Sequence, residues 1–458
     1  MKTDTIAAIA TAVNNGGISI IRVSGEEAFD VVDKIFRTKS GKQGLKDFAS
    51  HTIHFGHIID HGVTLDEVLV SVFRAPNSYT KEDVVEINCH GGVFVTKKIL
   101  EACLNNGARS ADPGEFTKRA FLNGRIDLSQ AEAVMDLINA KSEYALKSSV
   151  NQLRGSIYKQ IVNTREQLIL DVAFIEAVLD DPEHYEFGDY QTELKGRLEK
   201  EVIDLEELLK TADDGKFVRE GIQTAIVGKP NAGKSSLLNL LVGAEKAIVT
   251  NIEGTTRDII EESIQMDGIC LNIIDTAGIR DTDNVVEKIG VEKAINCIER
   301  ADLVLYVIDS SCPLNENDYS IIEKIKDKRS IILLNKTDLN QAVSKEDIQM
   351  LTDKEIFQIS AKCDTGLGDV KQCIKDMFFK GEISFNDQVY ITNARHKEAL
   401  IDSIASLHQV LQSMEDGMPE DFLSIDLMSA YERLGEIIGE SVGEDLVNTI
   451  FAEFCMGK

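Results

Sequence analysis

The residues best suited to chemistry lie in one glycine-rich segment, residues 228–235, which reads GKPNAGKS and fits the phosphate-binding pattern G-x-x-x-x-G-K-[ST]. An apolar, β-type run at 223–227 precedes it and a helix-compatible run at 236–240 follows, which is the context that the pattern requires. Glycines allow backbone N–H groups to approach phosphate oxygens, and a helix N-terminus adds partial positive charge. We therefore expect Lys234 to reach the β and γ phosphates and the Ser235 hydroxyl to bind Mg²⁺.

Four further motifs follow in an order that predicts the nucleotide. Residues 254–258 (GTTRD) lie where a switch loop is expected, and residues 275–278 (DTAG) offer Asp275 to Mg²⁺ and Gly278 to the γ-phosphate. Residues 335–338 (NKTD) combine Asn335 and Asp338, which match the donor and acceptor edge of guanine. Residues 360–362 (SAK) would support the guanine base. The five motifs together predict GTP as the ligand.

The predicted GTP contacts come from these motifs and from the segment between the first two. They are Asn231, Ala232, Gly233, Lys234, Ser235, Ser236, Thr250, Ile252, Thr255, Thr256, Asp275, Thr276, Ala277, Gly278, Asn335, Lys336, Asp338, Ser360, Ala361 and Lys362. The predicted Mg²⁺ ligands are Ser235 and Thr256.

Composition limits the class of protein that could carry this site. A length of 458 residues suggests roughly three domains, and a formal charge of −28 argues against a broad basic face for nucleic acid. It does not exclude RNA, because a partner could supply the basic surface. The eight cysteines form no C-x-x-C pair, which suits a reducing cytosol. Residues 1–13 faintly resemble a signal peptide, but Asp4 and a strand pattern at 18–23 contradict that interpretation, so we expect a cytoplasmic protein.

The elements that must position the motifs change in character along the chain. Residues 1–118 have an α/β or α+β pattern, with strands expected at 18–23, 52–59, 67–73 and 84–88 and a helix at 93–105. Four histidines crowd into residues 51–61. On a strand His51 and His57 would face away from His54, so we interpret them as ordinary strand residues rather than metal ligands.

Helical patterns lie on both sides of the nucleotide motifs. Ser129 and Glu132 have capping-box spacing, which predicts the start of a long helix. Helical periodicity continues to about residue 212 and returns after residue 380. We therefore predict an N-terminal α+β domain at 1–118, an inserted Ras-like, doubly wound P-loop G domain at 216–380, and a discontinuous all-α domain at 119–215 and 381–458. Residues 213–215 and 380–383 are the predicted crossing points, where the chain passes between the helical domain and the inserted G domain.

Taken together, these features resemble one family, the tRNA modification GTPases called MnmE or TrmE. The resemblance covers the whole chain. It depends on six segments of unusual sequence besides the P-loop: residues 76–83 (PNSYTKED), 90–92 (HGG), 112–116 (DPGEF), 120–123 (AFLN), 254–258 and 454–458 (FCMGK). The family tail has isoleucine or leucine where this chain has Met456, which is a conservative departure.

The resemblance implies an N-terminal domain that binds a reduced folate, either 5,10-methylenetetrahydrofolate or 5-formyltetrahydrofolate, and that forms a homodimer. It implies folate contacts at Arg22, Glu82, Arg125 and Lys458. Arg125 stands where the family also has lysine, so charge is kept but hydrogen-bond geometry is not. The resemblance also implies a partner, the flavoprotein MnmG, which uses FAD and NADH. The two proteins would add a carboxymethylaminomethyl or aminomethyl group to C5 of the wobble uridine of tRNA.

Hydrolysis must differ from that in Ras-like proteins, because Ile279 stands where they place a glutamine that orients water. A monovalent cation could stabilise the developing charge, with the Asn231 side chain and carbonyls of the switch loop as ligands. The resemblance implies K⁺ held by Asn231, Thr250, Ile252 and Thr255 when two G domains meet, and Glu287 as the residue that activates water. It also implies that Cys455 serves the modification chemistry, as a nucleophile or as a positioning group.

Two other classes of function compete with this interpretation. One is a regulatory GTPase that assists ribosome assembly; this class lacks the folate-like N-terminal block and the Cys-x-Gly-Lys tail. The other is a structural scaffold for a modifying partner, which the intact nucleotide motifs argue against.

Overall fold

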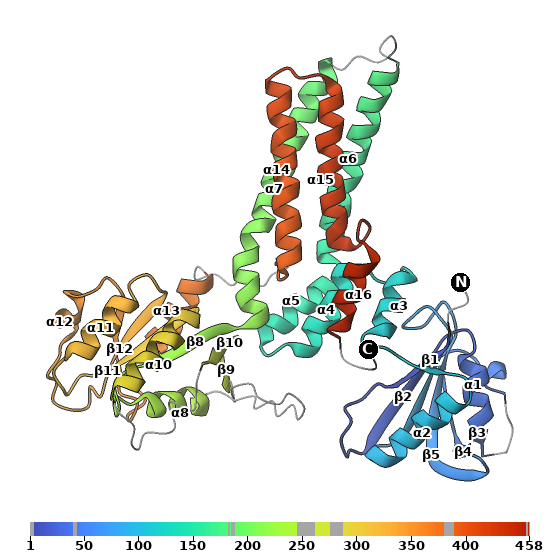
Figure 1. Ribbon diagram of the computed structural model, residues 1–458, viewed down its shortest axis with the longest axis horizontal. Coiled ribbons are helices and arrows are strands. Elements are labelled where there is room, and N and C mark those ends of the chain that lie inside the picture. Colours follow the sequence, from blue (N-terminus) through green and yellow to red (C-terminus); the bar gives the residue numbers. More distant parts are fainter. Residues whose placement is uncertain are drawn as a thin grey trace. The chain divides into compact units, whose positions relative to one another are not determined.

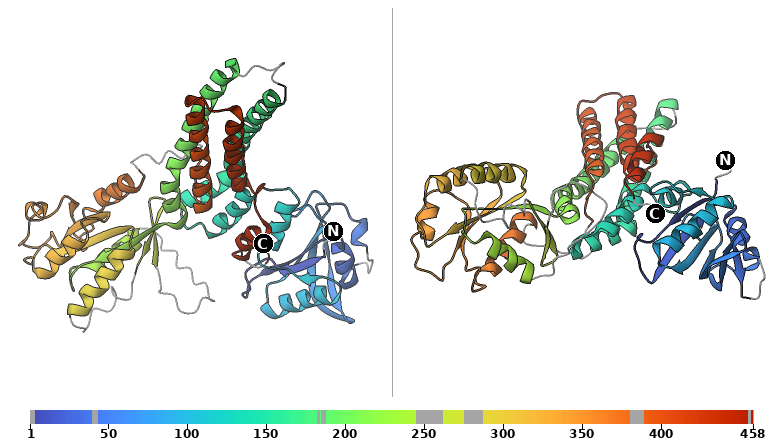
Figure 2. Two further views of the ribbon diagram at one scale, coloured as in Figure 1. Left: turned by 45° about the horizontal axis from the view of Figure 1, so that its top comes forward. Right: turned by 60° about the horizontal axis from the view of Figure 1, so that its bottom comes forward.

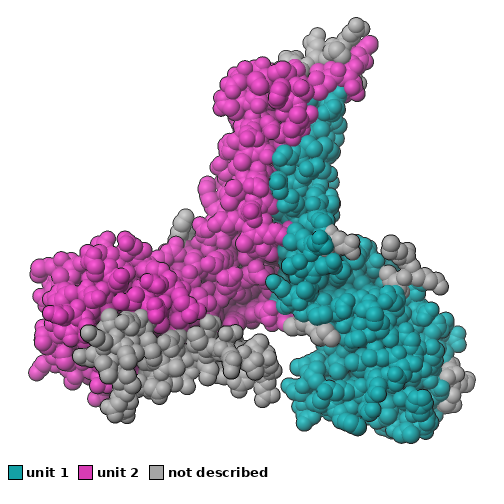
Figure 3. Space-filling view, in the orientation of Figure 1, with its two compact units in different colours: residues 1–135, 153–176, 427–458 teal, residues 136–152, 177–426 magenta. Residues whose placement is uncertain are grey.

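The computed structural model describes residues 4–39, 44–181, 184, 188–244, 262–274, 287–379, 389–454 and 457 (Figure 1). The chain forms two compact units, each built from separate stretches of sequence (Figure 3). Unit 1 consists of residues 1–135, 153–176 and 427–458, and unit 2 of residues 136–152 and 177–426.

Unit 1 contains a seven-stranded sheet in the order β3-β4-β5-β6-β2-β1-β7. Strand β7 runs parallel to β1, and the other paired strands are antiparallel. The bounds are β1 Ile6–Ile9, β2 Ile18–Ser24, β3 Phe36–Thr38, β4 Thr52–Asp60, β5 Val63–Phe73, β6 Val84–His90 and β7 Arg109–Ser110. The four predicted strands are confirmed, and β1, β3 and β7 were not predicted because each is four residues or shorter.

Helices α1 (Ala28–Ile35) and α2 (Val93–Asn105) cover this sheet (Figure 1). Phe29 of α1 and Ile99 of α2 are buried in one core with Ile21 and Ile87 of the central strands. The helix predicted at 93–105 is therefore confirmed, and its apolar face is what holds it on the sheet.

The remaining helices of unit 1 come from three distant stretches of chain. They are α3 Glu115–Leu122, α4 Leu128–Asn139 as far as Met135, α6 Ser156–Asp180 as far as Glu176, α15 Glu420–Ile438 from Leu427, and α16 Glu444–Ala452. Ala120, Leu128 and Phe451 share a buried cluster. Arg165 lies 4.0 Å above the Tyr431 ring and donates from Nε to the Tyr431 carbonyl, so it ties α6 to α15.

The predicted start of α4 is wrong by two residues. The Asp127 carboxylate accepts the N–H groups of Ser129 and Gln130, and the Gln130 side chain accepts the N–H of Asp127. This is a capping box from Asp127 to Gln130 rather than from Ser129 to Glu132. Both pairs fit the same spacing, and the one whose first member precedes the helix forms the cap.

Unit 2 contains a six-stranded sheet in the order β13-β12-β11-β8-β10-β9, parallel except where β9 meets β10. The bounds are β8 Ile222–Val227, β9 Glu262–Met266, β10 Ile269–Ile273, β11 Leu303–Asp309, β12 Ser330–Asn335 and β13 Glu355–Gln358. The runs β8, β11 and β12 are almost wholly buried, as expected for central parallel strands.

Helices cover both faces of this sheet, as the right view of Figure 2 shows for α8 in green and α10 in yellow. Their bounds are α8 Lys234–Ala244, α10 Glu287–Arg300, α11 Glu316–Lys324, α12 Lys345–Gln349 and α13 Leu367–Phe379. Residues of α8 and α13 share one core, and residues of α10, α11 and α12 share the other. The predicted doubly wound G domain is confirmed.

Three further helices belong wholly or mainly to unit 2: α5 Glu143–Leu153, α7 Gly188–Glu220 and α14 Ala394–Glu415. The crossing point predicted at residues 213–215 is wrong, because α7 continues through it and the turn into β8 falls at Gly221, whose φ is +79°. Gly215 instead allows α7 to lie close to the backbone at Ile391, because a Cβ at this position would lie 2.1 Å from the Ile391 carbonyl oxygen. The other predicted crossing point, 380–383, lies outside the described residues.

Candidate functional site

The phosphate-binding loop of unit 2 joins β8 to α8 through backbone conformations that expose its N–H groups. Gly228, Asn231 and Gly233 have φ values of +151°, +61° and +99°. A Cβ on Gly228 would lie 2.3 Å from the Val307 carbonyl oxygen, so only glycine allows the loop to pass β11 this closely. The loop therefore presents a concave row of donors at the N-terminus of α8, the arrangement that binds phosphate.

Lys234, the first residue of α8, folds back over the loop. Its Nζ donates to the carbonyls of Gly228 at 2.9 Å and Lys229 at 2.8 Å. Burial lowers the pKa of its ammonium. The two hydrogen bonds hold the ammonium over the loop, where a phosphate can accept its remaining donors.

The described residues fit only part of a Mg²⁺ site. Ser235 follows Lys234 in the first turn of α8, so its hydroxyl oxygen can serve a hard cation. Of the other predicted ligands and switch residues, Thr250, Ile252, Thr255, Thr256, Asp275, Thr276, Ala277 and Gly278 lie outside the described residues. Glu287 is the first residue of α10, and its side chain is also outside the description.

The predicted guanine-recognition residues are brought together at the carboxyl ends of β12 and β13. Asn335 is 2% exposed; its Nδ2 donates to the Ala232 carbonyl at 2.8 Å and its Oδ1 accepts the Ala361 N–H at 3.0 Å. The Ser360 hydroxyl donates to Asp338 at 2.6 Å, and this bond lowers the pKa of that carboxyl. Asp338 is thus an exposed carboxylate, held in place to accept the N–H groups of a guanine ring.

Lys336 and Lys362 flank this carboxylate. Lys336 has a left-handed backbone, with φ of +66°, and its ammonium pairs with Asp309 at 2.6 Å. Lys362 is exposed, in the loop that follows Ser360 and Ala361. Ser236 and Asn231 of the phosphate loop are exposed as well.

One contact of this site was not predicted from the sequence. Lys229 of the phosphate loop pairs with Asp318 of α11, whose side chain is 2% exposed. Asp318 also accepts the Tyr306 hydroxyl at 2.7 Å and the N–H of Asn315, the capping residue of α11. Burial first, and then the bond to Asp318, raise the pKa of Tyr306 far above its usual range. Lys229 occupies the first x position of the phosphate-binding motif, where any residue satisfies the pattern. The sequence therefore did not indicate this ion pair.

A second set of predicted residues gathers in unit 1 around Tyr79. The guanidinium of Arg22 lies 5.2 Å from the centre of the Tyr79 ring, and that of Arg125 lies 4.7 Å from it. Arg22 also pairs with Glu86 at 2.8 Å. Glu82 accepts the Ser24 hydroxyl at 2.7 Å and pairs with the buried Arg119 at 3.2 Å. The structure therefore brings Arg22, Glu82 and Arg125 to one loop, residues 75–83.

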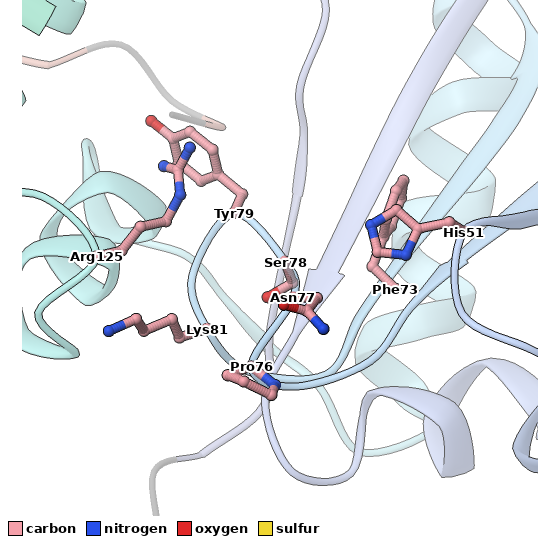
Figure 4. A pocket seen from close by; sticks show the side chains of 8 residues that line it. All are labelled: His51, Phe73, Pro76, Asn77, Ser78, Tyr79, Lys81 and Arg125. Carbon is pink, nitrogen blue, oxygen red and sulfur yellow. The ribbon is translucent and has the colours of Figure 1, made fainter. Parts of the chain in front are cut away.

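A pocket of about 470 Å³ opens beside this loop (Figure 4). Its lining residues are His51, Phe73, Pro76, Asn77, Ser78, Tyr79, Lys81 and Arg125. Tyr79 and Lys81 belong to the segment that carries the family resemblance, but the sequence alone did not single them out. A reduced folate combines a flat ring system with carboxylates, and an aromatic ring between two cations fits both parts.

The C-terminal residues belong to the same unit as this pocket. A Cβ on Gly457 would lie 2.2 Å from the Ile9 carbonyl oxygen, so Gly457 lies directly against the end of β1. Strand β1 pairs Ala8 with Arg22. Cys455 and Lys458 lie outside the described residues, but their described neighbour Gly457 is against the strand next to Arg22.

The histidine-rich segment does not form a single strand face. His51 and His61 have positive φ values of +62° and +46° and lie in the turns before and after β4, so the interpretation of His51 as a strand residue is wrong. His54 stacks on Phe48 and His57 lies 3.4 Å from Glu67. Within the described ranges, no group of three or more His, Cys, Asp or Glu residues is arranged to hold a metal.

The described part of the chain contains no helix with the length and hydropathy needed to cross a membrane. None of the seven cysteines that the structure describes forms a disulfide.

The doubly wound sheet of unit 2, with its phosphate loop and guanine-recognition residues, defines a P-loop GTPase, an enzyme that hydrolyses GTP. A sequence model of the MnmE helical domain matches residues 128–455, and one of the GTP-binding protein TrmE N-terminus matches residues 5–125. The chain is 58% identical over 458 residues to the tRNA modification GTPase MnmE of Lachnoclostridium phytofermentans, with 100% of both chains covered. It therefore belongs to the MnmE family of tRNA modification GTPases.

Other similar proteins include the tRNA modification GTPase MnmE of Clostridioides difficile, 49% identical over 457 residues with 99% of both chains covered. Among solved structures, an Era variant of Aquifex aeolicus bound to GDP and AlF₄⁻ is 27% identical, with 40% of this chain and 66% of that chain covered and a TM-score of 0.26.

Proposed function

We propose that this protein hydrolyses GTP to drive modification of the wobble uridine of tRNA. With the flavoprotein MnmG, which supplies FAD and NADH, it would add a carboxymethylaminomethyl or aminomethyl group to C5 using a folate one-carbon unit. The observation that carries this proposal is that one chain holds a guanine-recognition site in unit 2 and a second, cationic site around Tyr79 in unit 1. Its compartment would be the cytoplasm, where both substrates are available.

The folate part of the proposal is supported by the side chains around Tyr79. Arg22 and Arg125 supply positive charge at its ring, and Tyr79 is fixed by a hydrogen bond of 2.9 Å to Thr117. Glu82 is held by Ser24 and Arg119, so its carboxylate can orient a polar ring. A folate bound there would supply the one-carbon unit, and Lys458 and Cys455 would approach from the tail that passes β1.

A homodimer through unit 1 is supported by an exposed apolar strip on its sheet. Phe55 of β4 and Leu69 of β5 are directly paired and each 46% exposed, and Ile53, on the same face as Phe55, is 66% exposed. Contiguous exposed apolar surface of this kind is a feature of protein–protein interaction sites. A second copy of the chain would cover them.

The proposed K⁺ dependence starts from Asn231. Asn231 has a left-handed backbone and is exposed, so its amide oxygen could bind a cation. Thr250, Ile252 and Thr255 would complete the site when two G domains meet. K⁺ bound there would add positive charge beside the transferred phosphoryl group, Ser235 and Thr256 would hold Mg²⁺, and Glu287 would orient the attacking water.

The experiment that tests this function is mass spectrometry of tRNA nucleosides from a deletion strain. We expect the modified wobble uridine to disappear and to return with the wild-type gene. Arg22→Ala, Glu82→Ala and Cys455→Ser should fail to restore it, although each purified variant hydrolyses GTP at the wild-type rate. Unchanged wobble nucleosides in the deletion strain would contradict the proposal. They would favour the regulatory GTPase, which should also not be retained on immobilised folate.

A further inference from the structure

Lys81 has an unusual backbone conformation at the edge of the pocket in unit 1. Its φ is +59°, in the left-handed region that disfavours every residue except glycine and, to a lesser degree, asparagine and aspartate. A lysine in this conformation costs stability that a glycine would not. Such outliers concentrate at sites where the side chain has a function.

The ammonium of Lys81 is held beside Arg125. Its Nζ donates to the carbonyl of Gly124 at 2.9 Å, and Arg125 is the next residue. An ammonium has three donors, so two remain for a ligand. Figure 4 shows Lys81, Tyr79 and Arg125 on one side of the pocket, with His51 and Phe73 on the other.

No carboxylate competes for these two cations in the pocket. None of the described residues that line it is Asp or Glu, and in the described part of the chain neither Lys81 nor Arg125 forms an ion pair. The neighbouring acids face other groups, since Glu82 binds Ser24 and Asp83 accepts the Ala75 N–H at 2.9 Å. In a chain with a formal charge of −28, two such cations in one concavity indicate an anionic ligand.

We propose that Lys81 and Arg125 form a subsite for the γ-linked oligoglutamate tail of the reduced folate. This inference rests on the proposed folate site and extends it to a residue outside the predicted contacts. Each added γ-glutamyl residue brings one more carboxylate, and Lys81 binds one of these added carboxylates. A nucleic-acid backbone fits less well, because binding it takes a broad basic surface rather than two cations in a pocket.

The test compares the monoglutamate and triglutamate forms of 5-formyltetrahydrofolate by calorimetry on the full-length chain. We expect the wild type to bind the triglutamate more tightly, and Lys81→Gln to lose about fivefold on the triglutamate, the effect of one partly exposed ion pair. Monoglutamate affinity and GTP hydrolysis should not change. Lys81→Arg should keep the preference, and Lys98→Gln, on the exposed surface of α2, is the matched control.

Lys81→Gly separates charge from backbone strain. It should raise the melting temperature, because glycine adopts the left-handed conformation without strain, and still lose the preference for the triglutamate. Equal binding of both forms by the wild type, or an unchanged preference in Lys81→Gln or Lys81→Gly, would overturn the subsite while leaving the folate proposal intact. No binding of the monoglutamate would overturn both. Loss of tRNA affinity alone in Lys81→Gln would assign the cations to phosphate instead.

Discussion

Asn335 shows how single side chains arrange the nucleotide site. One amide binds the phosphate loop through the Ala232 carbonyl and the base loop through the Ala361 N–H, so two segments far apart in sequence share one anchor. Ser360 extends this arrangement to the Asp338 carboxylate. The groups predicted to recognise guanine are therefore held in place by the protein itself, which lowers the entropy lost on binding.

Asp338→Asn should change which base the site accepts. The carboxylate accepts two N–H groups of guanine, whereas the amide would present a donor to one of them, so GTP affinity should fall roughly 100-fold. Affinity for xanthosine triphosphate should rise, because xanthine has a carbonyl where guanine has its 2-amino group. Fluorescent nucleotide titration measures both. Asp353→Asn, an exposed acid in the same unit, is the control, and equal GTP affinity in Asp338→Asn would exclude the carboxylate from base recognition.

Glu115 is the centre of an ion-pair chain in unit 1. It pairs with Arg109 at 2.6 Å and with Arg119 at 2.9 Å, and Arg119 continues to Glu82. Burial acts to raise the pKa of Glu115, but the bonds from Arg109, the Asp112 N–H and Arg119 outweigh it and lower the pKa below its usual value of 4.5. The group therefore stabilises the fold above that value, and the stabilisation disappears as pH falls through the lowered pKa.

Glu115→Gln should destabilise the protein by about 3 kcal/mol at pH 7, because it leaves a buried Arg119 with one carboxylate fewer. The difference from wild type should shrink as the pH falls below about 4.5, since protonation removes the same charge from the wild type. Urea unfolding followed by circular dichroism at several pH values measures this. Asp112→Asn, at an exposed acid 3.9 Å from Arg109, should cost under about 0.5 kcal/mol at every pH. A pH-independent loss in Glu115→Gln would contradict the ion-pair account.

At the scale of elements, the phosphate loop is attached to α11 as well as to its own strand and helix. Lys229 joins the loop to Asp318, and Asp318 also binds Tyr306 of β11 and caps α11. Three elements thus share one buried carboxylate. Its three partners compensate for the cost of burying its charge.

Asp318→Ala should destabilise the protein by roughly 3 kcal/mol, because it leaves Lys229, Tyr306 and the N–H of Asn315 without their acceptor. It should also weaken GTP binding, since the loop loses its attachment to α11. Chemical denaturation and nucleotide titration measure the two effects. Asp369→Asn, at the exposed start of α13, should do neither. If Asp318→Ala unfolds too easily to be measured, Lys229→Met keeps the cap and tests the attachment alone.

Much of this fold follows from local sequence patterns. The strand β8 and the helices α2 and α8 were predicted because each is a single apolar run with one period. The capping box of α4 and the turn near Gly221 were misplaced because a short spacing or a lone glycine has more than one structural use. Gly215, interpreted as part of a linker, permits close packing inside a helix instead.

The nucleotide site was predictable from its motifs, and its attachments were not. Asn335 and Asp338 follow from spacing, but the pair formed by Lys229 and Asp318 joins residues 89 positions apart (318 minus 229) and no pattern links them. In unit 1, Arg22, Glu82 and Arg125 were predicted through resemblance alone. Tyr79 is the common neighbour of Arg22 and Arg125 only because four segments of the chain fold together, which is a non-local property.

For the whole molecule, we predict that turnover depends on the cation and on self-association. Ile279 stands where Ras-like proteins place a glutamine, and an added positive charge at the phosphates is worth roughly 10³–10⁵ in rate when an arginine supplies it. GTP hydrolysis should be fast in K⁺, slow in Na⁺ at equal ionic strength, and faster as protein concentration rises. Glu287→Ala should reduce turnover strongly and spare GTP binding and dimerisation. Phosphate-release assays with both salts over a range of concentrations measure this, and equal rates throughout would contradict it.

The assembly of unit 1 from residues 1–135, 153–176 and 427–458 has a consequence for how the protein is made. A ribosome delivers the N-terminal segment first, but Ala120 and Leu128 pack in one buried cluster with Val447, Phe451 and Phe454, which are translated much later. Nascent chains that still lack α16 therefore keep an uncovered apolar surface, which chaperones and proteases recognise. Once α16 has been translated and packs against this cluster, the apolar surface is covered.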